Sequence, residues 1–399
     1  MEFIIDLVKD IKKVASPFDT NKSLVVHEPN FNNTRANEYL KDCISSGWVS
    51  TAGVWVEKFE KKICEITKSN FAVAITNGTD ALRLALFILG VEPNDEVLVP
   101  SLTFVGTVNA ISHLGAIPNF IDVEKEKYCV CPKKLENYLN SICIIKKSIS
   151  YNKHTGRRIK AIVPVHLFGN PAKLNEINNI AKKWNLNVVE DAAEALGSFS
   201  RNIHCGLMGD VGILSFNGNK IVTCGGGGAI ITNSSSIAEK AKHLSTTAKV
   251  KDKFDLFHDE IGWNDRMPNI NAALGFSQLE IFDEILNKKR LLYNNYKKQL
   301  NDKYPLRILS CDEKDSSNNW LITIELESKN LNNIKILRNS LLDFATKNNI
   351  FLRPVWRPIH TLKMYKNSPK SNLDNTIKAS QSLISLPSSP SLVKDNIKW

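Results

Sequence analysis

The chain has 399 residues, 43% of them hydrophobic, so it is long and apolar enough to bury a large core and to fold as two domains. The formal net charge is +11, but the 52 basic residues are interleaved with 41 acidic ones. This argues against nucleic-acid binding and suits a small anionic substrate such as a nucleotide phosphate. The apolar runs, such as "ALRLALFIL" at 81–89, are shorter than the roughly 18 residues that cross a bilayer, so no membrane span is predicted.

Residues 1–16 predict an amphipathic helix, because Ile4, Leu7 and Ile11 recur at helical spacing. The acidic Glu2 lies where a secretory signal would be basic, so we expect this helix to remain on the mature protein. The eight cysteines are irregularly spaced and show no zinc or redox pattern, which predicts free thiols, no metal site and a location in the reducing cytoplasm.

From residue 71 onward, short apolar runs alternate with segments of helical character. Continuous apolar runs of this length are typical of buried strands, and their alternation with helices predicts a mostly parallel sheet with helices on both faces. The expected strands are 71–76, 95–100, 117–123, 159–165, 186–192 and 210–216, and the expected helices are 77–90, 107–115 and 173–185.

The rest of the chain predicts a hairpin or loop and a second, smaller domain. The polar, turn-rich stretch 146–160 favours an exposed hairpin or loop. The second domain has an α+β pattern, with helices expected at 269–300 and 331–349 and strands at 319–326 and 350–356. The expected divisions are an N-terminal extension and arm over 1–45, a large domain over 46–275 and a small C-terminal domain over 276–399.

Polar residues of possible function follow the expected strands. Right-handed crossovers place the C-terminal ends of parallel strands along one edge, where α/β sheets bind their ligands. The residues expected at this edge are Asn77, Gly78, Thr79, Phe104, Asp191, Glu194 and Lys220.

Asp191 has two interpretations. At the exit of a buried strand an ionised carboxylate needs a partner, and it could simply cap the next helix. It could instead keep a pyridine nitrogen protonated, which is the partner that pyridoxal phosphate requires to act as an electron sink.

Lys220 follows Asp191 by 29 residues (220 − 191), which leaves room for one more strand before the chain returns to the same edge. A lone lysine in a turn is usually solvated. Ser215 before it offers a hydroxyl to a phosphate, and the glycines 225–228 after it allow close approach of the backbone. In a partly dry site such a lysine can bind a carbonyl cofactor covalently.

"TNGTDAL" at 76–82 could hold the phosphate, because Gly78 permits close approach and Thr79 begins a helix whose first amides attract anions. An ordinary helix cap is the alternative. Phe104 could lie on the pyridine ring or pack in the core, and His166 favours a structural role. The glycine run precedes an apolar strand rather than a helix, which makes a dinucleotide site a weak interpretation.

Six motifs occur in a recognisable order and spacing: "NGTDALRLAL", "DEVLVPSLTFVGTVNAI", "PVHLFGNP", "VVEDAAEALGS", "GDVGILSFNGNKIVTCGGGGAIIT" and "GWNDRMPNINAALGFSQLE". Together they resemble the DegT/StrS family of pyridoxal-phosphate sugar aminotransferases over about residues 45–285. "RPVWRPIHTLKMY" at 353–365 adds a moderate likeness.

The resemblance implies an α/β fold of the type I class of pyridoxal-phosphate transferases, in which a large domain with a mostly parallel sheet between helices is followed by a smaller α+β domain. It also implies a homodimer with active sites shared between subunits. By motif, Lys220 is similar to the lysine that binds the cofactor and moves the proton. Asp191 matches the aspartate on the ring nitrogen, and Glu194 stands near the ring hydroxyl.

The same resemblance implies further ligands. Gly78, Thr79 and Ser215 are similar to phosphate ligands, and Asn264 in "GWNDR" to an asparagine that reaches the cofactor phosphate of the partner subunit. Expected near the substrate are Arg266, His360 and Tyr365.

A finer resemblance points to the subgroup that acts on UDP-4-keto-6-deoxy-N-acetylglucosamine in bacillosamine and legionaminic acid pathways. It rests on "SGWVSTAG", "HTGRR", "SFNGNK" and "RPVWRPIH". The implied reaction moves an amino group from L-glutamate to C4 of the UDP-linked keto sugar. Two features depart from the subgroup: the N-terminal extension, and "DAAEA", where relatives often have threonine in the third place.

Other interpretations remain open at this point. The substrate could be another nucleotide sugar, of the GDP-perosamine type or a C3-keto sugar. A sugar dehydratase is disfavoured because such relatives carry histidine where this chain has Lys220. A catalytically silent relative that binds cofactor or sugar, and a nucleotide-binding dehydrogenase, are the more distant alternatives.

Overall fold

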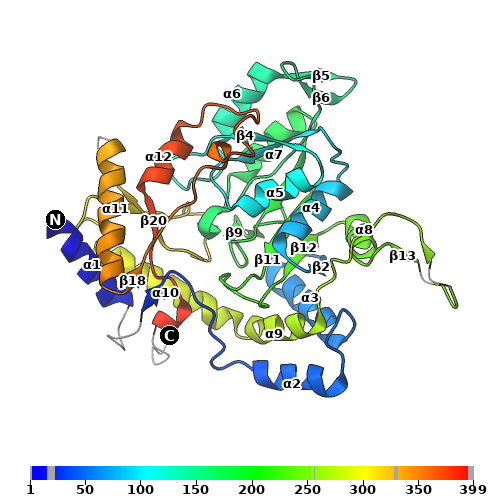
Figure 1. Ribbon diagram of the computed structural model, residues 1–399, viewed down its shortest axis with the longest axis horizontal. Coiled ribbons are helices and arrows are strands. Elements are labelled where there is room, and N and C mark those ends of the chain that lie inside the picture. Colours follow the sequence, from blue (N-terminus) through cyan, green and yellow to red (C-terminus); the bar gives the residue numbers. More distant parts are fainter. Residues whose placement is uncertain (1, 16–22, 251, 256, 328–330, 394–399) are drawn as a thin grey trace.

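A seven-stranded sheet forms the centre of the molecule in the computed structural model, which describes residues 2–15, 23–250, 252–255, 257–327 and 331–393 (Figure 1). The strand order is β2-β12-β11-β8-β7-β3-β4, and β12 runs antiparallel to both of its neighbours. The six expected strands and the run after the glycines form it: β2 (Phe71–Ile75), β3 (Glu96–Pro100), β4 (Ile117–Ile121), β7 (Ile159–Ile162), β8 (Asn187–Asp191), β11 (Val211–Ser215) and β12 (Gly228–Thr232).

Both faces of this sheet are covered by helices. Alternate residues of β3 show this directly, because Val97 and Val99 join one buried apolar cluster and Leu98 joins the other. The cluster of Val97 includes α4 (Gly78–Ile88), α5 (Val105–His113) and α8 (Ser235–Ser245). The cluster of Leu98 includes α3 (Val54–Thr67), α6 (Pro132–Ile142), α7 (Leu174–Lys183) and α9 (Asn269–Leu279). Burial on both faces explains why these strands are continuously apolar.

A second sheet has four antiparallel strands in the order β15-β17-β20-β19. Its strands are β15 (Leu306–Ile308), β17 (Thr323–Leu326), β19 (Arg353–Pro354) and β20 (Leu383–Ser385), and its helices include α10 (Phe282–Leu300) and α11 (Leu331–Lys347). The arrangement fits the expected α+β pattern, and with the seven-stranded sheet it confirms the predicted fold class.

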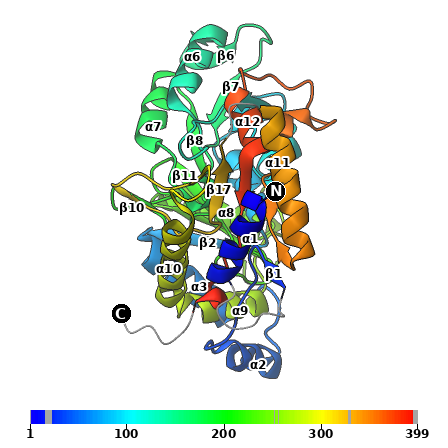
Figure 2. The same cartoon turned by 90° about the vertical axis from the view of Figure 1, so that its left-hand side faces the viewer.

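The N-terminal helix α1 (Glu2–Ala15) packs into this second core. Leu7 and Ile11 are fully buried in the same apolar cluster as Tyr296 of α10 and Ile324 of β17. Figures 1 and 2 both show α1 close to α11. A parallel pair of short strands, β1 (Leu24–Val25) and β18 (Ile350–Phe351), adds a further link. Helix α1 is therefore part of the C-terminal core, and the expected domain boundaries remain predictions. Met1 and Ser16, expected in this helix, lie outside the described residues.

Two predicted elements differ in detail from the structure. The helical region 269–300 is divided near Glu280 into α9 and α10, and the strand expected at 350–356 is split into β18 and β19, which join different sheets. The hairpin predicted within 146–160 is present as β5 (Cys143–Lys146) and β6 (Ile149–Asn152), displaced by a few residues.

The remaining elements are short or peripheral. They are α2 (Ala36–Ser46), α12 (Asp374–Ser382), β9 (Phe199–Ser200), β10 (Ile203–His204), β13 (Lys249–Val250), β14 (Phe257–His258), β16 (Asp315–Ser316) and the 3₁₀ turns Leu167–Gly169, Ile359–Thr361 and Pro390–Leu392. All eight cysteines are free, as predicted. None of the helices in the described ranges is both long and apolar enough to cross a membrane.

Candidate active site

Lys220 lies in the turn that follows β11, with its backbone amide bonded to the Asn217 carbonyl at 3.0 Å. Its Nζ is 3.5 Å from Oε1 of Glu194 and 4.0 Å from the centre of the Trp320 ring. Only 11% of the lysine side chain is exposed, so this is not the solvated loop charge that a lone turn lysine would be.

Trp320 is held rigidly beside this lysine. Its indole Nε1 donates to the carbonyl of Asn219 at 2.7 Å, and its backbone amide donates to Oδ1 of Asn318 at 2.8 Å. Its own carbonyl accepts from Nζ of Lys289 at 2.6 Å. Because the ring nitrogen and the backbone of Trp320 are all hydrogen-bonded, the π face of the ring has a fixed position beside the lysine amine.

Asp191, the last residue of β8, is buried and accepts two hydrogen bonds. Thr107 Oγ1 donates to Oδ2 at 2.7 Å, and the amide of Ala193 donates to Oδ1 at 3.1 Å. Across the described part of the chain, no ion pair joins this carboxylate to a basic side chain. A buried carboxylate of this kind is therefore suited to a cationic group on a ligand.

Glu194 faces Lys220 from the loop after β8. Oε2 accepts from the amide of Phe168 at 2.8 Å, and the Asn318 side-chain amide donates to the Glu194 carbonyl at 2.9 Å. Burial raises the pKa of the Glu194 carboxyl, although the charge of Lys220 opposes the rise. The glutamate is thus placed to share a proton with the lysine or with a ligand hydroxyl.

The turn between β2 and α4 lies against the end of β11. The side chain of Asn77 caps α4 by accepting from the amide of Asp80 at 2.9 Å. A methyl group on Gly78 would come within 2.9 Å of the Ser215 Cβ, so only glycine allows this approach. The first amides of α4 and the Ser215 hydroxyl therefore converge, as an anion site at a helix N-terminus requires.

Phe104 precedes α5 and presents its ring to solvent, with 52% of the residue exposed. A methyl group on Gly106 would lie 2.8 Å from Thr79 Oγ1 and 3.0 Å from the Phe104 ring, so the ring lies next to the start of α4. Core packing, the alternative for this residue, does not fit an exposed ring.

The model of the DegT/DnrJ/EryC1/StrS aminotransferase family matches residues 31–399. The chain belongs to this aminotransferase family. The aminotransferase is 34% identical over 380 residues to a GDP-perosamine synthase of Escherichia coli O157:H7, with 94% of this chain and 96% of that protein covered. It is 33% identical over 365 residues to EpsN of Bacillus subtilis (strain 168), which is named as a pyridoxal phosphate-dependent aminotransferase, with 90% of each covered.

Solved structures agree with this assignment. A DegT DnrJ EryC1 StrS aminotransferase from Brucella abortus is 28% identical and has a TM-score of 0.79, with 90% of this chain and 91% of that chain covered. The family resemblance in the sequence is thereby confirmed. The aminotransferase is an enzyme of the transferase class that uses pyridoxal phosphate.

The residues present fit this cofactor. The buried Asp191, which has no cationic partner among the described residues, suits a protonated pyridine nitrogen. The start of α4 with Ser215 suits the phosphate, the exposed ring of Phe104 offers a flat surface, and Lys220 offers an amine. When bound, the cofactor supplies an electron sink for chemistry at the carbon that carries the amino group.

Two of the other predicted residues lie beside the end of β2. Arg266 forms an isolated antiparallel bridge with Ile75, and the carbonyl of Asp265 accepts from the amide of Thr76 at 2.8 Å. Asn264 is exposed and bridges to Thr246. The stretch 264–266 therefore runs next to the expected phosphate site, and Asn264 is free to face a second subunit.

The predicted substrate residues His360 and Tyr365 differ in their settings. His360 Nδ1 is 2.7 Å from Oγ of Ser101, just after β3, and burial with the charge of Lys370 lowers the pKa of its imidazole. Tyr365 is buried in the core, and its hydroxyl is bonded to Asn109 at 2.7 Å. His360 therefore lies just beyond the end of β3 and Tyr365 is packed in the core, and the substrate roles of both remain predictions.

His166 has the structural role expected of it. Its Nδ1 accepts from the amide of Ala172 at 3.1 Å, and its Nε2 is 2.8 Å from Oε2 of Glu190. Glu190 also accepts from the amide of Gly206 at 2.7 Å, and the pKa of this carboxyl is lowered because these bonds outweigh its burial. This fully buried pair holds the loop after β7 against strand β8.

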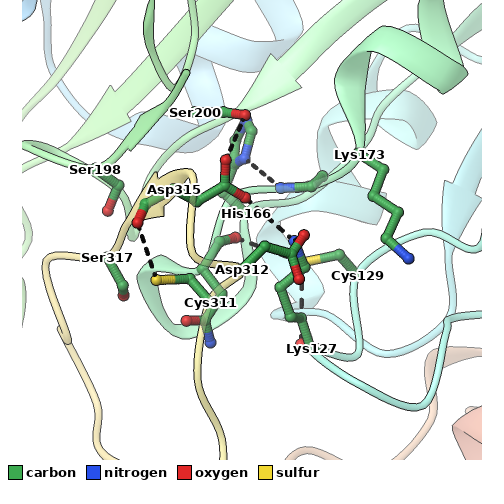
Figure 3. A network of polar contacts seen from close by, with 12 residues as sticks. Lys127, Cys129, His166, Lys173, Ser198, Ser200, Cys311, Asp312, Asp315 and Ser317 are labelled. Atoms are coloured by element: carbon green, nitrogen blue, oxygen red, sulfur yellow. Dashed lines mark hydrogen bonds and ion pairs between the residues drawn. The ribbon is translucent and has the colours of Figure 1, made fainter. Parts of the chain in front are cut away.

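A second polar network anchors the segment that carries Trp320 (Figure 3). The buried Lys127 Nζ lies 2.7 Å from Asp312 and 3.3 Å from Asp315, and Ser200 Oγ donates to Asp315 at 2.7 Å. Burial alone would lower the pKa of Lys127, but the hydrogen bond to Asp312 outweighs it and the pKa is raised. A charged lysine therefore ties this segment to the large sheet a few residues before Trp320.

Thr107 and Trp320 are site residues that sequence reasoning missed. Threonine in a helix and tryptophan before a strand are typical of ordinary packing, and only the fold brings Trp320 to a lysine 100 residues away (320 − 220). Trp320 also forms one wall of a cavity of about 510 Å³, which Asn219, Phe168, Arg353 and Trp356 line as well.

Proposed function

We propose that the enzyme transfers an amino group from L-glutamate to C4 of a nucleotide-linked 4-keto-6-deoxy sugar. The first candidate substrate is a UDP-linked 4-keto-6-deoxy-N-acetylhexosamine. Its product would be a 4-amino-4,6-dideoxy sugar nucleotide for a surface glycan of the legionaminic acid or bacillosamine type. The observation that carries the proposal is Lys220, held between Glu194 and Trp320, the second of which lines a cavity of about 510 Å³.

Each residue of the site has a defined task in this proposal. Lys220 Nζ removes a proton from the carbon that bears the amino group and returns one, as general base and then general acid. Asp191 provides the fixed negative charge that favours the transition state, and Glu194 stays close enough to the amine, at 3.5 Å, to orient it. Trp320 and Phe168 shield the reacting groups from water.

The cavity suits a nucleotide sugar. Aromatic walls from Trp320, Trp356 and Phe168 suit the apolar faces of a sugar ring, and Phe168 and Trp356 are stacked at 5.6 Å with an interplanar angle of 13°. Arg353 is exposed at the same cavity and can bind a diphosphate. The formal net charge of +11 also favours an anionic substrate.

A second candidate is the GDP-linked 4-keto-6-deoxy sugar. The relatives from Escherichia coli O157:H7 and Vibrio cholerae, 34% and 33% identical, are both named GDP-perosamine synthases. This finding supports a GDP substrate at least as well as the motif resemblance supports UDP. A C3-keto sugar remains a weaker alternative, and the assignment to an enzyme family argues against a catalytically silent protein.

We further propose a homodimer in which Asn264 reaches the cofactor phosphate of the partner subunit. Its exposed position beside the end of β2 supports this role. The cytoplasmic location and the identity of the amino donor remain predictions.

The test is turnover with a panel of keto sugars. The purified holoenzyme is mixed with L-glutamate and UDP-, GDP- or dTDP-linked 4-keto-6-deoxy sugars, and the release of 2-oxoglutarate is followed while NMR assigns the configuration at C4. We expect one nucleotide series to react and Lys220→Ala to be inactive. Absence of product with every keto sugar would contradict the proposal.

A further inference from the structure

Arg83, on the second turn of α4, links the two segments that border the expected phosphate site. Its Nη2 forms an ion pair with Oδ2 of Asp265 and lies 3.5 Å from Oδ1 of Asp80, one helical turn earlier. Only 14% of the Arg83 side chain is exposed, and the exposed fractions of Asp265 and Asp80 are 13% and 23%. The three charges are largely withdrawn from solvent, so removing one of them leaves its partners poorly compensated.

The guanidinium of Arg83 is also held by an aromatic ring. Its Cζ atom lies 4.9 Å from the centre of the Trp263 ring, and Phe87 packs edge-on against the same ring at 4.9 Å. Arg83 Nε is buried and has no hydrogen-bond partner among the described residues. A buried donor left unpaired costs folding free energy, so stability alone does not account for this position. The guanidinium keeps an orientation that is set by one ring and two carboxylates.

Asp80 connects Arg83 to the turn before α4. Its Oδ2 accepts from Asn77 Nδ2 at 2.5 Å and from Thr76 Oγ1 at 3.2 Å, and its amide donates to Asn77 Oδ1 at 2.9 Å. These bonds fix the backbone on both sides of residues 78–79, which are expected to meet the phosphate. The position of the Asp80 carboxylate therefore determines the shape of this turn.

Asp265 connects the same arginine to the stretch 264–266. Its carbonyl accepts from the amide of Thr76 at 2.8 Å, which places the stretch against the end of β2. Burial raises the pKa of the Asp265 carboxyl, the charge of Arg83 opposes the rise and the charge of Asp80 adds to it. Without the guanidinium, two like charges would lie together beside a site that must attract an anion.

We propose that Arg83 is a positioning residue for the cofactor phosphate. Its guanidinium holds the start of α4 against the stretch 264–266 and neutralises the two carboxylates, so that the first amides of α4 keep both their place and their attraction for an anion. In this role Arg83 acts through Asp80 and Asp265 and does not itself bind the phosphate. The inference goes beyond the proposed function, because it concerns the cofactor and applies to any sugar nucleotide.

Binding of pyridoxamine 5′-phosphate and of pyridoxamine to the cofactor-free, full-length protein tests this. The two ligands differ only in the phosphate, and neither has the carbonyl that reacts with a lysine. Tryptophan fluorescence gives both Kd values for the parent, for Arg83→Met and, as a matched control, for Arg290→Met at an exposed position of α10. We expect Arg83→Met to weaken pyridoxamine phosphate at least about tenfold, while the Kd of pyridoxamine stays within about twofold of the parent. The control should match the parent for both ligands.

Two further variants separate charge from geometry. Arg83→Lys keeps the positive charge but not the planar fork that contacts two carboxylates, so we expect a loss of about threefold for pyridoxamine phosphate alone. Arg83→Met combined with Asp265→Asn removes one of the two uncompensated charges and should bind pyridoxamine phosphate more tightly than Arg83→Met does. A double variant that binds no more tightly would overturn the part of the inference that rests on charge.

The remaining outcomes decide the rest of the inference. Equal losses for the two ligands in Arg83→Met would give Arg83 a merely structural role and overturn the inference, as would unchanged Kd values. A parent that binds pyridoxamine phosphate no more tightly than pyridoxamine would overturn it together with the phosphate site. If Arg83→Met does not fold, an unchanged preference for the phosphate form in Arg83→Lys would overturn it. None of these outcomes depends on the sugar nucleotide, so the proposed function keeps its own test.

Discussion

Lys289 and Lys220 have surroundings that make the two lysines chemically different. Lys289 is fully buried and donates to the carbonyls of Trp320 and Ser388 at 2.6 and 2.5 Å, and burial lowers the pKa of its amine well below the usual value. Its hydrogen bonds make it a structural tie between α10 and two loops. Lys220 instead has an acidic partner, an aromatic face and a side chain that is 11% exposed, so we expect it to be the lysine that a carbonyl group reaches.

At the same scale, Asp191→Asn should separate catalysis from cofactor attachment. The amide keeps the size of the side chain and its bond from Thr107 but loses the negative charge, so we expect kcat to fall at least about a hundredfold while Lys220 still binds the cofactor. Steady-state turnover and the visible absorbance of the holoenzyme measure the two effects. The control is Asp210→Asn, which should stay active. Asp210 precedes β11, at the end of that strand away from Ser215 and Lys220. Full activity of Asp191→Asn would show that its charge is not required.

His204 predicts how stability depends on pH. Burial lowers the pKa of this fully buried imidazole to about 4, whereas an unfolded histidine titrates near pH 6.5. As the pH falls, the His204 imidazole therefore binds a proton in the unfolded chain before it does so in the folded protein. This contribution to stability is complete above about pH 6.5 and is lost as the pH falls toward 4, on the order of 3 kcal/mol. Urea unfolding between pH 7 and 4.5 should show the fall, with a smaller slope for His204→Gln. Equal slopes for the two proteins would exclude His204 as the cause.

At the scale of elements, the site is made where strands end and helices begin. The turn before α4 contacts the end of β11 through Gly78, and β12 passes the same turn so closely that a methyl group on Gly228 would lie 2.6 Å from the Gly78 nitrogen. Within the glycine run, Gly226 has open space around it and Gly225 has a φ of +76°. A methyl group on Gly227 would also come within 2.7 Å of Met267 Cε. The run thus combines two close approaches and one left-handed turn with one position, Gly226, that does not require glycine.

Gly78→Ala should weaken cofactor binding without unfolding the protein. The added methyl group would come within 2.9 Å of the Ser215 Cβ and push the helix start away from the serine hydroxyl, so we expect a loss of at least about tenfold in affinity for pyridoxal phosphate. Titration of the cofactor-free protein, followed by tryptophan fluorescence, gives the Kd. Gly226→Ala is the matched control with unchanged affinity. If both variants bind like the parent, Gly78 does not shape the phosphate site.

The sequence predicts the secondary-structure elements well where a strand is buried on both faces. The continuous apolar runs of β3 and β8 predict strands because their two faces pack against helices, and the same reasoning predicts that Asp191 and Lys220 share one edge. It does not predict the split of 350–356, because the pairing of β18 with β1 depends on a segment more than 300 residues earlier. Trp320 is missed for the same reason, since only tertiary packing brings it to the cavity and to Lys220.

At the scale of the whole molecule, the two sheets are tied together by buried polar contacts and by the N-terminal helix. Lys127 with Asp312 and Asp315 links the second core to the large sheet, and α1 fills the second core from the other end of the chain. A buried lysine with two carboxylates contributes little net stability but leaves charge uncompensated if one partner is removed, so it favours one relative position of the two sheets. The cavity between Phe168 and Asn219 on one side and Trp320 and Arg353 on the other depends on that position.

The exposed apolar surface near Asn264 predicts that the protein forms a dimer. Phe254 and Ile261 are 84% and 85% exposed in the stretch that leads to Asn264, which is unusual for large apolar side chains on a free surface. We expect a dimer in analytical ultracentrifugation, and Ile261→Asp should weaken it. Ile336→Asp, at a 65% exposed position on α11, should leave it intact. A parent that sediments as a monomer, with full activity, would contradict shared active sites.

Reductive trapping tests the central claim most directly. The holoenzyme is treated with borohydride, digested and analysed by mass spectrometry to find the lysine that carries the cofactor. The account predicts pyridoxal phosphate on the peptide with Lys220, and its complete loss from that peptide in Lys220→Ala. Attachment at Lys289 or at any other lysine, with Lys220 unmodified, would contradict it.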